Sequence, residues 1–191
     1  MEAALAQIAV PLLWLTWCAY WYFAARGVKR VRRRESVASR WGHILPLVIA
    51  GLLIAVPTLP GWLGQLLLPR SWILSGIGVV VVAAGLGFSV WARRVLGRNW
   101  SGTVTLKEDH ELVQSGPYRW IRHPIYTGIL LGFVGSAVAR DEWRGVLAVL
   151  IAGVALWRKL RLEERWMHEL FGARYEEYRR RTWALIPWVP Q

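Results

Sequence analysis

Two short stretches of the sequence combine ionisable and aromatic side chains in a pattern that suits chemistry on a small polar ligand. The first runs from residue 110 to residue 128 and places Arg122 and His123 directly before Pro124. Proline is favoured at the first position of a helix, so the pair is predicted to lie at a helix amino terminus, beside unpaired N–H groups and the positive end of the helix dipole. That arrangement attracts a carboxylate or a phosphate. The alternative is that Arg122 and His123 are ordinary basic residues that flank a membrane-spanning helix on its cytoplasmic side.

The second stretch, residues 157–172, reads as one helix that ends near a glycine. Glu164 lies on a stripe of large apolar residues at three- and four-residue steps, and is therefore predicted to face apolar neighbours. The stripe contains Trp157, Leu160, Met167 and Phe171. A buried carboxylate is unfavourable without a partner. The alternative is an exposed pair within the helix, either Arg161 with Glu164 or Lys159 with Glu163.

Together the two stretches offer a cationic helix start and an acidic helical patch. A zwitterionic ligand with a carboxylate and an amine would suit both, and the methionine part of S-adenosylmethionine has that chemistry. The histidines His123 and His168 lack a third partner at ligand spacing, so the sequence predicts no metal site. The single cysteine, Cys18, excludes an internal disulfide.

The elements that position these residues are predicted from an apolar composition. The 191 residues are 55% hydrophobic and 19% charged, against roughly 45–50% and about 25% in ordinary soluble domains. The length suits one domain, and the apolar content excludes a disordered chain. Five uncharged runs are predicted to be transmembrane helices, namely residues 4–25, 43–59, 71–92, 125–139 and 146–157. In the second run, Pro46 and Pro57 are expected to interrupt the helix.

The basic residues indicate the orientation of the chain in the membrane. The segments after the first, third and fifth runs hold seven, six and eight of the 24 lysines and arginines. The positive-inside rule then places the amino terminus outside and the carboxyl terminus in the cytoplasm of a multi-pass integral membrane protein. Because the basic residues are divided among three loops, nucleic acid is not an expected partner. The sequence makes no prediction about the oligomeric state.

The last two runs are short, and residues 140–145 between them favour a tight helical hairpin. The helices are expected to continue on the side opposite this turn, although one re-entrant pair is the alternative. Glycines in the third run are predicted to allow close helix contact. They are Gly76, Gly78, Gly85 and Gly87. Most tryptophans near the span ends are interpreted as interfacial belts, among them Trp14 and Trp100.

The predicted fold class is all-α, a polytopic membrane helix bundle of about five transmembrane helices with a cytoplasmic C-terminal helical extension. All 191 residues form a single integral-membrane domain in this interpretation. Residues 1–98 contain the first three spans and the basic loop, and residues 99–191 contain the last two spans, the C-terminal helices and the candidate site.

The stretch from His110 to Gly128 resembles the signature of isoprenylcysteine carboxyl methyltransferases and their phospholipid-methyltransferase relatives. The shared pattern is H-x-L-V-x-x-G-x-Y-x-x-x-R-H-P-x-Y-x-G, followed by the pair Glu163–Glu164 and by F-G-x-x-Y-x-x-Y at residues 171–178. The similarity covers roughly residues 99–190. It implies a membrane methyltransferase that uses S-adenosyl-L-methionine, releases S-adenosyl-L-homocysteine and has no Rossmann fold.

The resemblance also implies roles for particular residues. The cofactor contacts carried over from the family are Thr103, His110, Glu111, Leu112, Val113, Tyr118, His123, Pro124, Ile125, Tyr126 and Glu163. The family has a substrate-binding arginine four residues before the first matched glutamate, and this chain has Lys159 there, with Arg161 nearby. Lysine keeps the charge but lacks the two-pronged donor geometry of arginine.

Methyl transfer requires the acceptor atom to lie in line with the bond that breaks. A carboxylate acceptor needs a cation to orient it, and Arg122 is assigned this catalytic role, assisted by Lys159 or Arg161. An amine acceptor needs a base, for which Glu164 or His123 is the candidate. Cations outnumber acids in both stretches, so a carboxylate acceptor is favoured.

The expected substrate is therefore an isoprenylcysteine-like molecule or another small lipophilic acid, which enters sideways from the bilayer. Three alternatives remain at this point. They are a phospholipid or amine N-methyltransferase, an NADPH-dependent membrane reductase with a similar helical core, and a non-catalytic membrane subunit or transporter. No charged residue lies inside a predicted span, which argues against an ion pathway.

Overall fold

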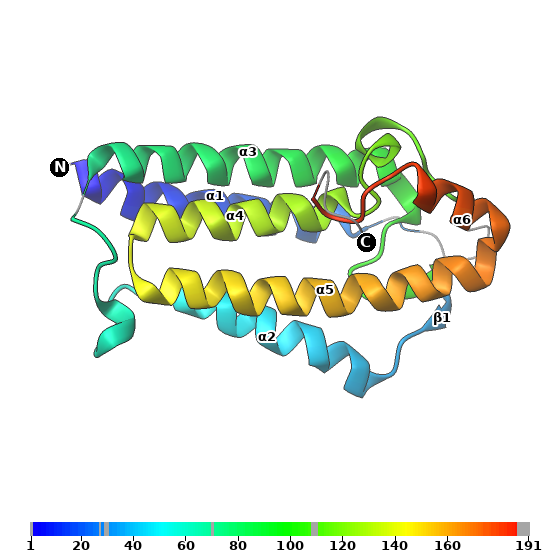
Figure 1. Ribbon diagram of the computed structural model, residues 1–191, viewed down its shortest axis with the longest axis horizontal. Coiled ribbons are helices and arrows are strands. Elements are labelled where there is room, and N and C mark those ends of the chain that lie inside the picture. Colours follow the sequence, from blue (N-terminus) through cyan, green and yellow to red (C-terminus); the bar gives the residue numbers. More distant parts are fainter. Residues whose placement is uncertain (1, 27, 29–30, 70, 108–110, 187–191) are drawn as a thin grey trace.

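The computed structural model describes residues 2–26, 28, 31–69, 71–107 and 111–186. Long helices run side by side along one axis, and a short helix and several loops gather at one end of them (Figure 1). Helix α3 packs against α1 and α4, whereas α5 packs against α2 and α4. The helices are α1 (Glu2–Ala24), α2 (Val37–Ala55), α3 (Trp72–Leu96), α4 (Pro124–Arg140), α5 (Trp143–Phe171) and α6 (Ala173–Arg180). Three single 3₁₀ turns, η1 (Trp62–Gly64), η2 (Gly97–Asn99) and η3 (Gly116–Arg119), lie in the connections.

Each of the five predicted apolar runs forms a helix, with differences at the ends. Helix α4 begins at Pro124, as predicted, and α5 continues beyond its apolar part at residues 146–157 to end before Gly172. The prediction that Pro46 interrupts the second helix is wrong, because α2 runs through this residue. Helix α2 begins before the uncharged run because the side chain of Ser36 accepts a hydrogen bond from the Ser39 N–H and caps it.

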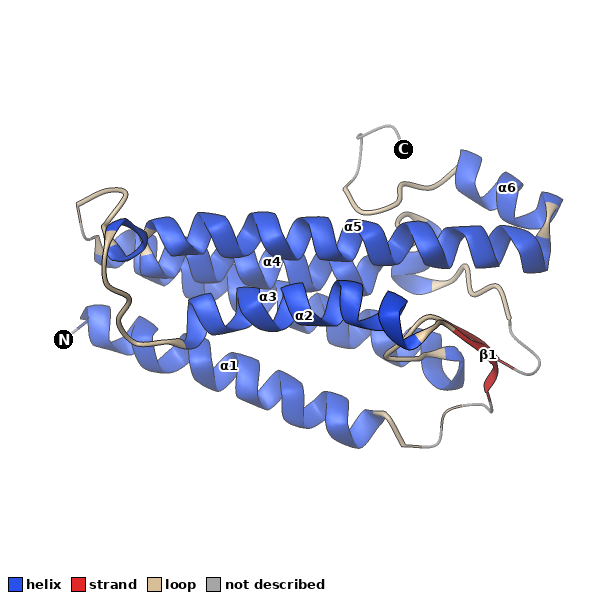
Figure 2. Cartoon of the chain, turned by 90° about the horizontal axis from the view of Figure 1, so that it is seen from below, coloured by secondary structure: helices blue, strands red, loops and turns tan. Residues whose placement is uncertain are grey.

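The expectation of an all-helical chain also needs one correction. Strand β1 (Val31–Arg34) pairs antiparallel with strand β2 (Thr105–Lys107) in a two-stranded ribbon beside the polar end of the helices (Figure 2). The two strands are far apart in the sequence and each is too short to show an alternating pattern. The ribbon links the segment before α2 to the loop that follows α3.

Small residues bring α3 and α4 into close contact. A Cβ atom at Gly85 would lie 2.7 Å from the carbonyl oxygen of Gly128, and one at Gly78 would lie 2.6 Å from that of Gly135. No larger residue fits at these points without separating the helices. The prediction of close packing is thus confirmed for Gly78 and Gly85. A Cβ atom at Gly76 or Gly87 would meet nothing within 4 Å.

Two tryptophans attach α1 to the other helices. Trp14 Nε1 donates a hydrogen bond to Ser136 Oγ at 3.0 Å, and Trp17 Nε1 donates one to Ser89 Oγ at 2.7 Å. The Trp14 ring also packs on Phe133, with centroids 5.2 Å apart. Its interpretation as part of an interfacial belt is therefore wrong, because its polar atom is used inside the bundle.

The turn between α4 and α5 closes the carboxyl end of α2. Arg140 donates hydrogen bonds to the carbonyl oxygens of Ile54, Val56 and Pro57, and Arg144 donates to those of Val56 and Pro57. Arg144 is 1% exposed and also pairs with Glu142. These two cations satisfy carbonyl groups that a helix end leaves without intrahelical partners.

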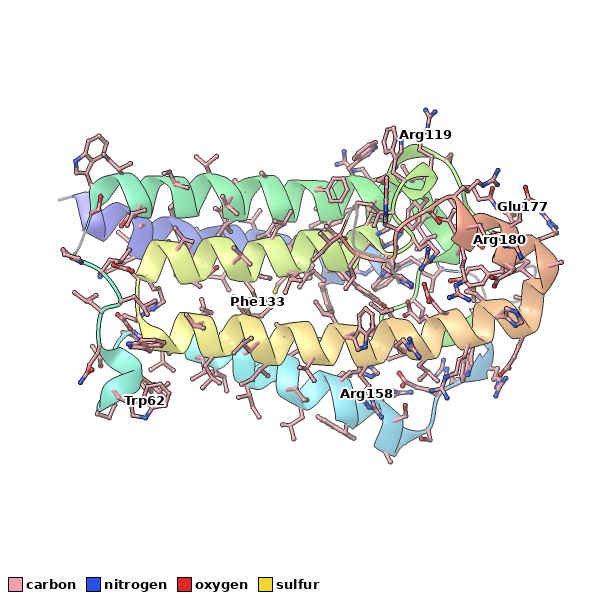
Figure 3. All side chains as sticks on the ribbon, viewed as in Figure 1. Trp62, Arg119, Phe133, Arg158, Glu177 and Arg180 are labelled. Atoms are coloured by element: carbon pink, nitrogen blue, oxygen red, sulfur yellow. The ribbon has the colours of Figure 1, made fainter. Side chains whose placement is uncertain are left out.

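Charged side chains are concentrated at the opposite end of the bundle. Arg119, Glu177 and Arg180 lie there, whereas Phe133 lies within the bundle and Trp62 at the end with the α4–α5 turn (Figure 3). By length and composition, residues 37–55 and 72–99 qualify as membrane-spanning helices among the described residues, and the apolar helix α4 is shorter. The number of spans and the sides on which the termini lie stay predictions.

Candidate functional site

The start of α4 is joined to the segment that follows α6. The N–H groups of Arg122 and His123 donate to the carbonyl oxygens of Trp183 and Ala184 at 2.8 and 3.0 Å. The backbone N–H groups of Arg122 and His123 are therefore occupied within the fold; the expectation of an anion site at the first turn of α4 stays a prediction. The side chains of Arg122 and His123, rather than their backbone, are what this segment presents to a ligand.

The two glutamates of α5 meet the two residues that precede α4. Arg122 Nε donates to Glu164 Oε1 at 2.7 Å, and the ring nitrogens of His123 lie 3.5 Å from Glu163 and 3.4 Å from Glu164. The hydroxyl of Tyr126, one turn into α4, donates to Glu163 Oε1. The predicted convergence of the two stretches is present: the glutamates pair with the first turn of α4 and the two residues before it, instead of forming the intrahelical pairs considered as the alternative.

Burial and neighbouring charges shift the pKa values of Glu163, Glu164 and His123 in opposite directions. All three residues lie outside the apolar segments of α4 and α5. Burial alone would raise the pKa of Glu164, but His123 and Arg122 outweigh it and lower the pKa to about 2. The pKa of Glu163 is lowered in the same way, by His123 and Lys159. Burial would lower the pKa of His123, yet its contacts with both glutamates raise it. The cluster is thus arranged to keep both carboxylates ionised.

Arg122 has a second function within the fold. Its Nη1 donates to the carbonyl oxygens of Thr182 and Arg179, so the guanidinium holds the segment after α6 as well as Glu164. Its Nη2 is buried and has no hydrogen-bond partner among the described residues. The two N–H groups of this nitrogen therefore have no acceptor among the described residues.

The two candidate cations on α5, Lys159 and Arg161, differ in position. Lys159 is buried, and its Nζ donates to the carbonyl oxygen of Gly102 at 2.9 Å and lies 5.2 Å from the Tyr126 ring centroid. An ammonium group has three donors, so Lys159 keeps donors for a ligand. Arg161 is exposed and lies near the Trp157 ring, 5.9 Å from its centroid.

A pocket of about 330 Å³, here called the polar pocket, lies between these residues and the loop after α3. Its ionisable lining comprises Glu111, Arg122, His123, Lys159 and Glu163. Its wall on the loop side is formed by residues 99–105, and Leu112, Val113 and Ile125 add apolar surface. Its tryptophan and tyrosine lining comprises Trp17, Trp21, Trp100, Tyr118, Tyr126, Trp166, Tyr175 and Tyr178.

A second and larger cavity, here called the apolar cavity, lies next to the polar pocket along the helices. Its volume is about 900 Å³, and it is lined mainly by apolar residues of α1, α2 and α4, with the first turn of α3 and residues 140–142 at its far end. Trp17 and Ile129 line both spaces, so the two spaces are neighbours that share these two side chains as a common wall, here called the junction. A polar compartment and a lipophilic compartment thus meet inside one bundle.

Most of the residues assigned to cofactor binding line the polar pocket. They are Thr103, Glu111, Leu112, Val113, Tyr118, His123, Ile125, Tyr126 and Glu163. Pro124 starts α4 without lining the pocket, and His110 lies outside the described residues. Of the cations assigned to the acceptor, Arg122 and Lys159 line the pocket and Arg161 does not. Glu164 does not line the pocket, but it contacts two residues that do, Arg122 and His123.

Sequence reasoning missed the contribution of the first helix and of several aromatic residues. Trp17 and Trp21 of α1 stack with ring centroids 4.3 Å apart, and Trp21 meets Trp100 edge to face at 6.0 Å. Trp100 was interpreted as an interfacial residue, but it forms part of the pocket wall. The tryptophans at positions 14, 17 and 21 share one helix face, and this spacing was the signal that could have identified them.

Comparison with known proteins places these features in a family context. The sequence model of the phospholipid methyltransferase family matches residues 74–174. A probable protein-S-isoprenylcysteine O-methyltransferase of Oryza sativa subsp. japonica is 29% identical over 128 residues, which cover 64% of this chain and 65% of that protein. The cobalt-zinc-cadmium resistance protein CzcN of Cupriavidus metallidurans is 32% identical over 151 residues, covering 77% of this chain and 62% of that protein.

A solved structure shows the same arrangement of helices. The eukaryotic intramembrane Ras methyltransferase, isoprenylcysteine carboxyl methyltransferase, superposes with a TM-score of 0.58 over 90% of this chain and 53% of that chain, at 22% identity. The chain spans less than two thirds of the length of the curated relatives described here. The likeness in structure concerns the fold.

Proposed function

Because the chain belongs to the phospholipid methyltransferase family, whose model matches more than half of it, we propose that it is a membrane-embedded, S-adenosylmethionine-dependent methyltransferase for a lipophilic acceptor. The observation that carries the proposal is the junction of the polar pocket with the apolar cavity at Trp17 and Ile129. A polar donor and a lipophilic acceptor can meet there without either leaving its preferred environment. The curated relatives named protein-S-isoprenylcysteine O-methyltransferases support the same activity.

The residues of the polar pocket fit this donor. The carboxylate of Glu163 suits an ammonium group, and the unpaired Nη2 of Arg122 suits a carboxylate. Aromatic rings such as Tyr118 and Trp100 suit a flat base. When bound, S-adenosylmethionine supplies an electrophilic methyl group on its sulfonium. The protein contributes the positions of both reactants, which is the main requirement of an in-line transfer.

A carboxylate acceptor agrees best with the ionisation of the site. An amine must lose a proton before it can attack, and neither Glu163 nor Glu164 is a strong base, because their contacts with cations lower the pKa of both. His123 is held between the two carboxylates, which raises its pKa and favours its charged form. A carboxylate needs only a cation to orient it, and Lys159 is the candidate with spare donors in the pocket.

The apolar cavity suits the hydrocarbon part of such an acceptor. Its lining comes mainly from α1, α2 and α4, so a hydrocarbon chain can lie among these helices while its reactive end reaches the polar pocket. Burial of hydrocarbon contributes about 0.8 kcal/mol for each CH₂ group. We assign to this cavity an isoprenylcysteine-like molecule or another small lipophilic acid. The proposal includes a location in the membrane with the amino terminus outside and the carboxyl terminus in the cytoplasm, which the distribution of basic residues supports.

The proposal is tested with purified full-length protein in lipid nanodiscs. Isothermal titration calorimetry with S-adenosylhomocysteine is expected to show binding. Radiolabelled S-adenosylmethionine is expected to yield base-labile methyl esters with an S-farnesylcysteine analogue or a long-chain fatty acid as acceptor. If phosphatidylethanolamine is the only acceptor that becomes methylated, the acceptor is an amine and the proposal of a carboxylate acceptor is rejected. Binding of NADPH without binding of S-adenosylhomocysteine would reject the methyltransferase proposal in favour of a reductase.

A further inference from the structure

The segment before α2 contacts the wall of the polar pocket through a buried glutamate. The N–H of Val104 donates to Glu35 Oε1 at 3.1 Å, and the N–H of Glu35 donates to the carbonyl oxygen of Val104 at 3.1 Å. Both residues are buried, with Val104 1% exposed. Glu35 therefore binds this point of the loop after α3 by side chain and backbone together.

Val104 lies in the middle of the part of the wall that runs from Gly102 to Thr105. Its side chain packs against Trp166 of α5, which also lines the pocket. Two positions earlier, the carbonyl oxygen of Gly102 accepts the hydrogen bond from Lys159. The wall is thus fixed at two points by two charged residues that come from different parts of the chain.

The carboxylate of Glu35 is itself supported by the first turns of α2. The hydroxyl of Ser39 donates to Glu35 Oε2 at 2.9 Å, and His43 Nε2 lies 3.4 Å from Oε1. The side chains of Glu35 and His43 are each only 1% exposed. A buried carboxylate is unfavourable unless it is hydrogen-bonded, and here one of its bonds goes to the pocket wall. The hydrogen bonds of Glu35 therefore indicate that its carboxylate holds the pocket wall, which an apolar side chain at this position could not do.

We propose that Glu35 is a positioning residue of the polar pocket, which sets the affinity for the methyl donor by fixing residues 102–105 through its bond to Val104. The inference rests on the proposed function and adds to it a residue of the amino-terminal half, outside the segment matched by the family model. Glu35 does not line the pocket. It acts on the donor through the backbone of the wall.

A neighbouring contact provides a matched control. Arg33, two residues earlier, pairs with Glu169 at 2.8 Å, and its guanidinium lies 4.4 Å from the ring centroid of Trp166. The side chains of Arg33 and Glu169 are 52% and 56% exposed. Exposed pairs contribute little, so Arg33→Gln is expected to change donor binding by less than about twofold.

The experiment compares Glu35→Ala, Glu35→Gln and Arg33→Gln in nanodiscs. Calorimetry measures the Kd for S-adenosylhomocysteine, and steady-state assays measure kcat and the KM values for donor and acceptor. A hydrogen bond to a charged group contributes about 1.5–3 kcal/mol, or about tenfold or more in a binding constant. Glu35→Ala is expected to raise the donor Kd and KM about tenfold, with kcat and the acceptor KM within about twofold. Glu35→Gln keeps an oxygen acceptor and is expected to fall between Glu35→Ala and wild type.

The outcomes separate this inference from the proposed function. If the wild type fails to bind S-adenosylhomocysteine, the proposed function fails first. If the wild type binds and the Glu35 variants bind equally well, the inference is overturned. Parallel losses in donor affinity, acceptor affinity and kcat would indicate a purely structural role and would also overturn it. If Glu35→Ala does not fold, the binding and kinetic measurements on Glu35→Gln decide. Hydrogen–deuterium exchange in Glu35→Gln should then increase at residues 102–105 and not elsewhere.

Discussion

Replacing Glu164 by glutamine tests the ionic cluster at the polar end of the bundle. The substitution preserves the shape of the side chain and removes its charge, so Arg122 keeps a neutral partner. Arg122 is 2% exposed and Glu164 13% exposed at their side chains. Removal of one partner from a buried ion pair leaves the other charge uncompensated, which is strongly destabilising.

The magnitude follows from the ionisation of Glu164. Its pKa falls from a usual value of 4.5 to about 2, and each tenfold change corresponds to 1.36 kcal/mol, which gives about 3 kcal/mol of stabilisation. Water screens part of this carboxylate, so we expect about 2 kcal/mol. For a chain of this length, 1 kcal/mol shifts the melting temperature by roughly 2–4 °C. Glu164→Gln is therefore expected to lower it by about 4–8 °C.

Intrinsic tryptophan fluorescence during heating in nanodiscs measures this shift. Glu169→Gln is the control on the same helix, because Glu169 forms an exposed pair and should contribute at most about 1 kcal/mol. Equal melting temperatures for Glu164→Gln and Glu169→Gln would refute the reasoning. The reasoning would also be refuted if Glu164→Gln lowered the melting temperature by the same amount in a protein in which Arg122 is replaced by methionine.

The same substitution predicts a dependence on pH. The pKa of Glu164 is lower in the folded protein than in the unfolded chain, so its stabilising effect is complete above about pH 4.5 and is lost as the pH falls towards 2. The difference in melting temperature between wild type and Glu164→Gln should be constant above pH 5 and should shrink below pH 4.5. A difference that grew on acidification would contradict the assigned direction.

Three further predictions concern the two spaces. Glu163→Gln removes a charged acceptor from the polar pocket and should weaken S-adenosylhomocysteine binding at least tenfold by calorimetry. Lys159→Met should raise the KM for a carboxylate acceptor about tenfold, whereas the exposed Arg161→Met should change it less than twofold; equal effects would remove Lys159 from its proposed role. Ile129→Trp should fill the junction and abolish methylation of long-chain acceptors while donor binding persists, and Leu131→Trp, on the exposed side of α4, should permit turnover.

The sequence predicted the elements whose signals are local. Pro124 identified the start of α4, and the glycine at 172 identified the end of α5, because these residues impose backbone constraints that do not depend on the rest of the chain. The pairing of Arg122 and His123 with the two glutamates could also be anticipated, since the hairpin between α4 and α5 brings residues at similar distances from the turn to one level.

Contacts between distant segments could not be predicted in this way. Glu35 and Val104 are 69 positions apart, and Trp17 and Ser89 are 72 apart. The spacing of Trp14, Trp17 and Trp21 marks one face of α1, but it does not say which distant segment that face contacts. For the same reason the role of Trp17 at the junction of the two spaces appears only when the helices are packed.

The arginines at the α4–α5 turn have a consequence for biogenesis. Arg140 and the carbonyl oxygen of Ile54 are separated by 86 positions, which a ribosome needs about 4–17 s to synthesise at about 5–20 residues per second. Throughout that interval the last carbonyl groups of α2 lack their final partners. Until the α4–α5 turn has been synthesised, these carbonyl groups need other hydrogen-bond donors, such as water.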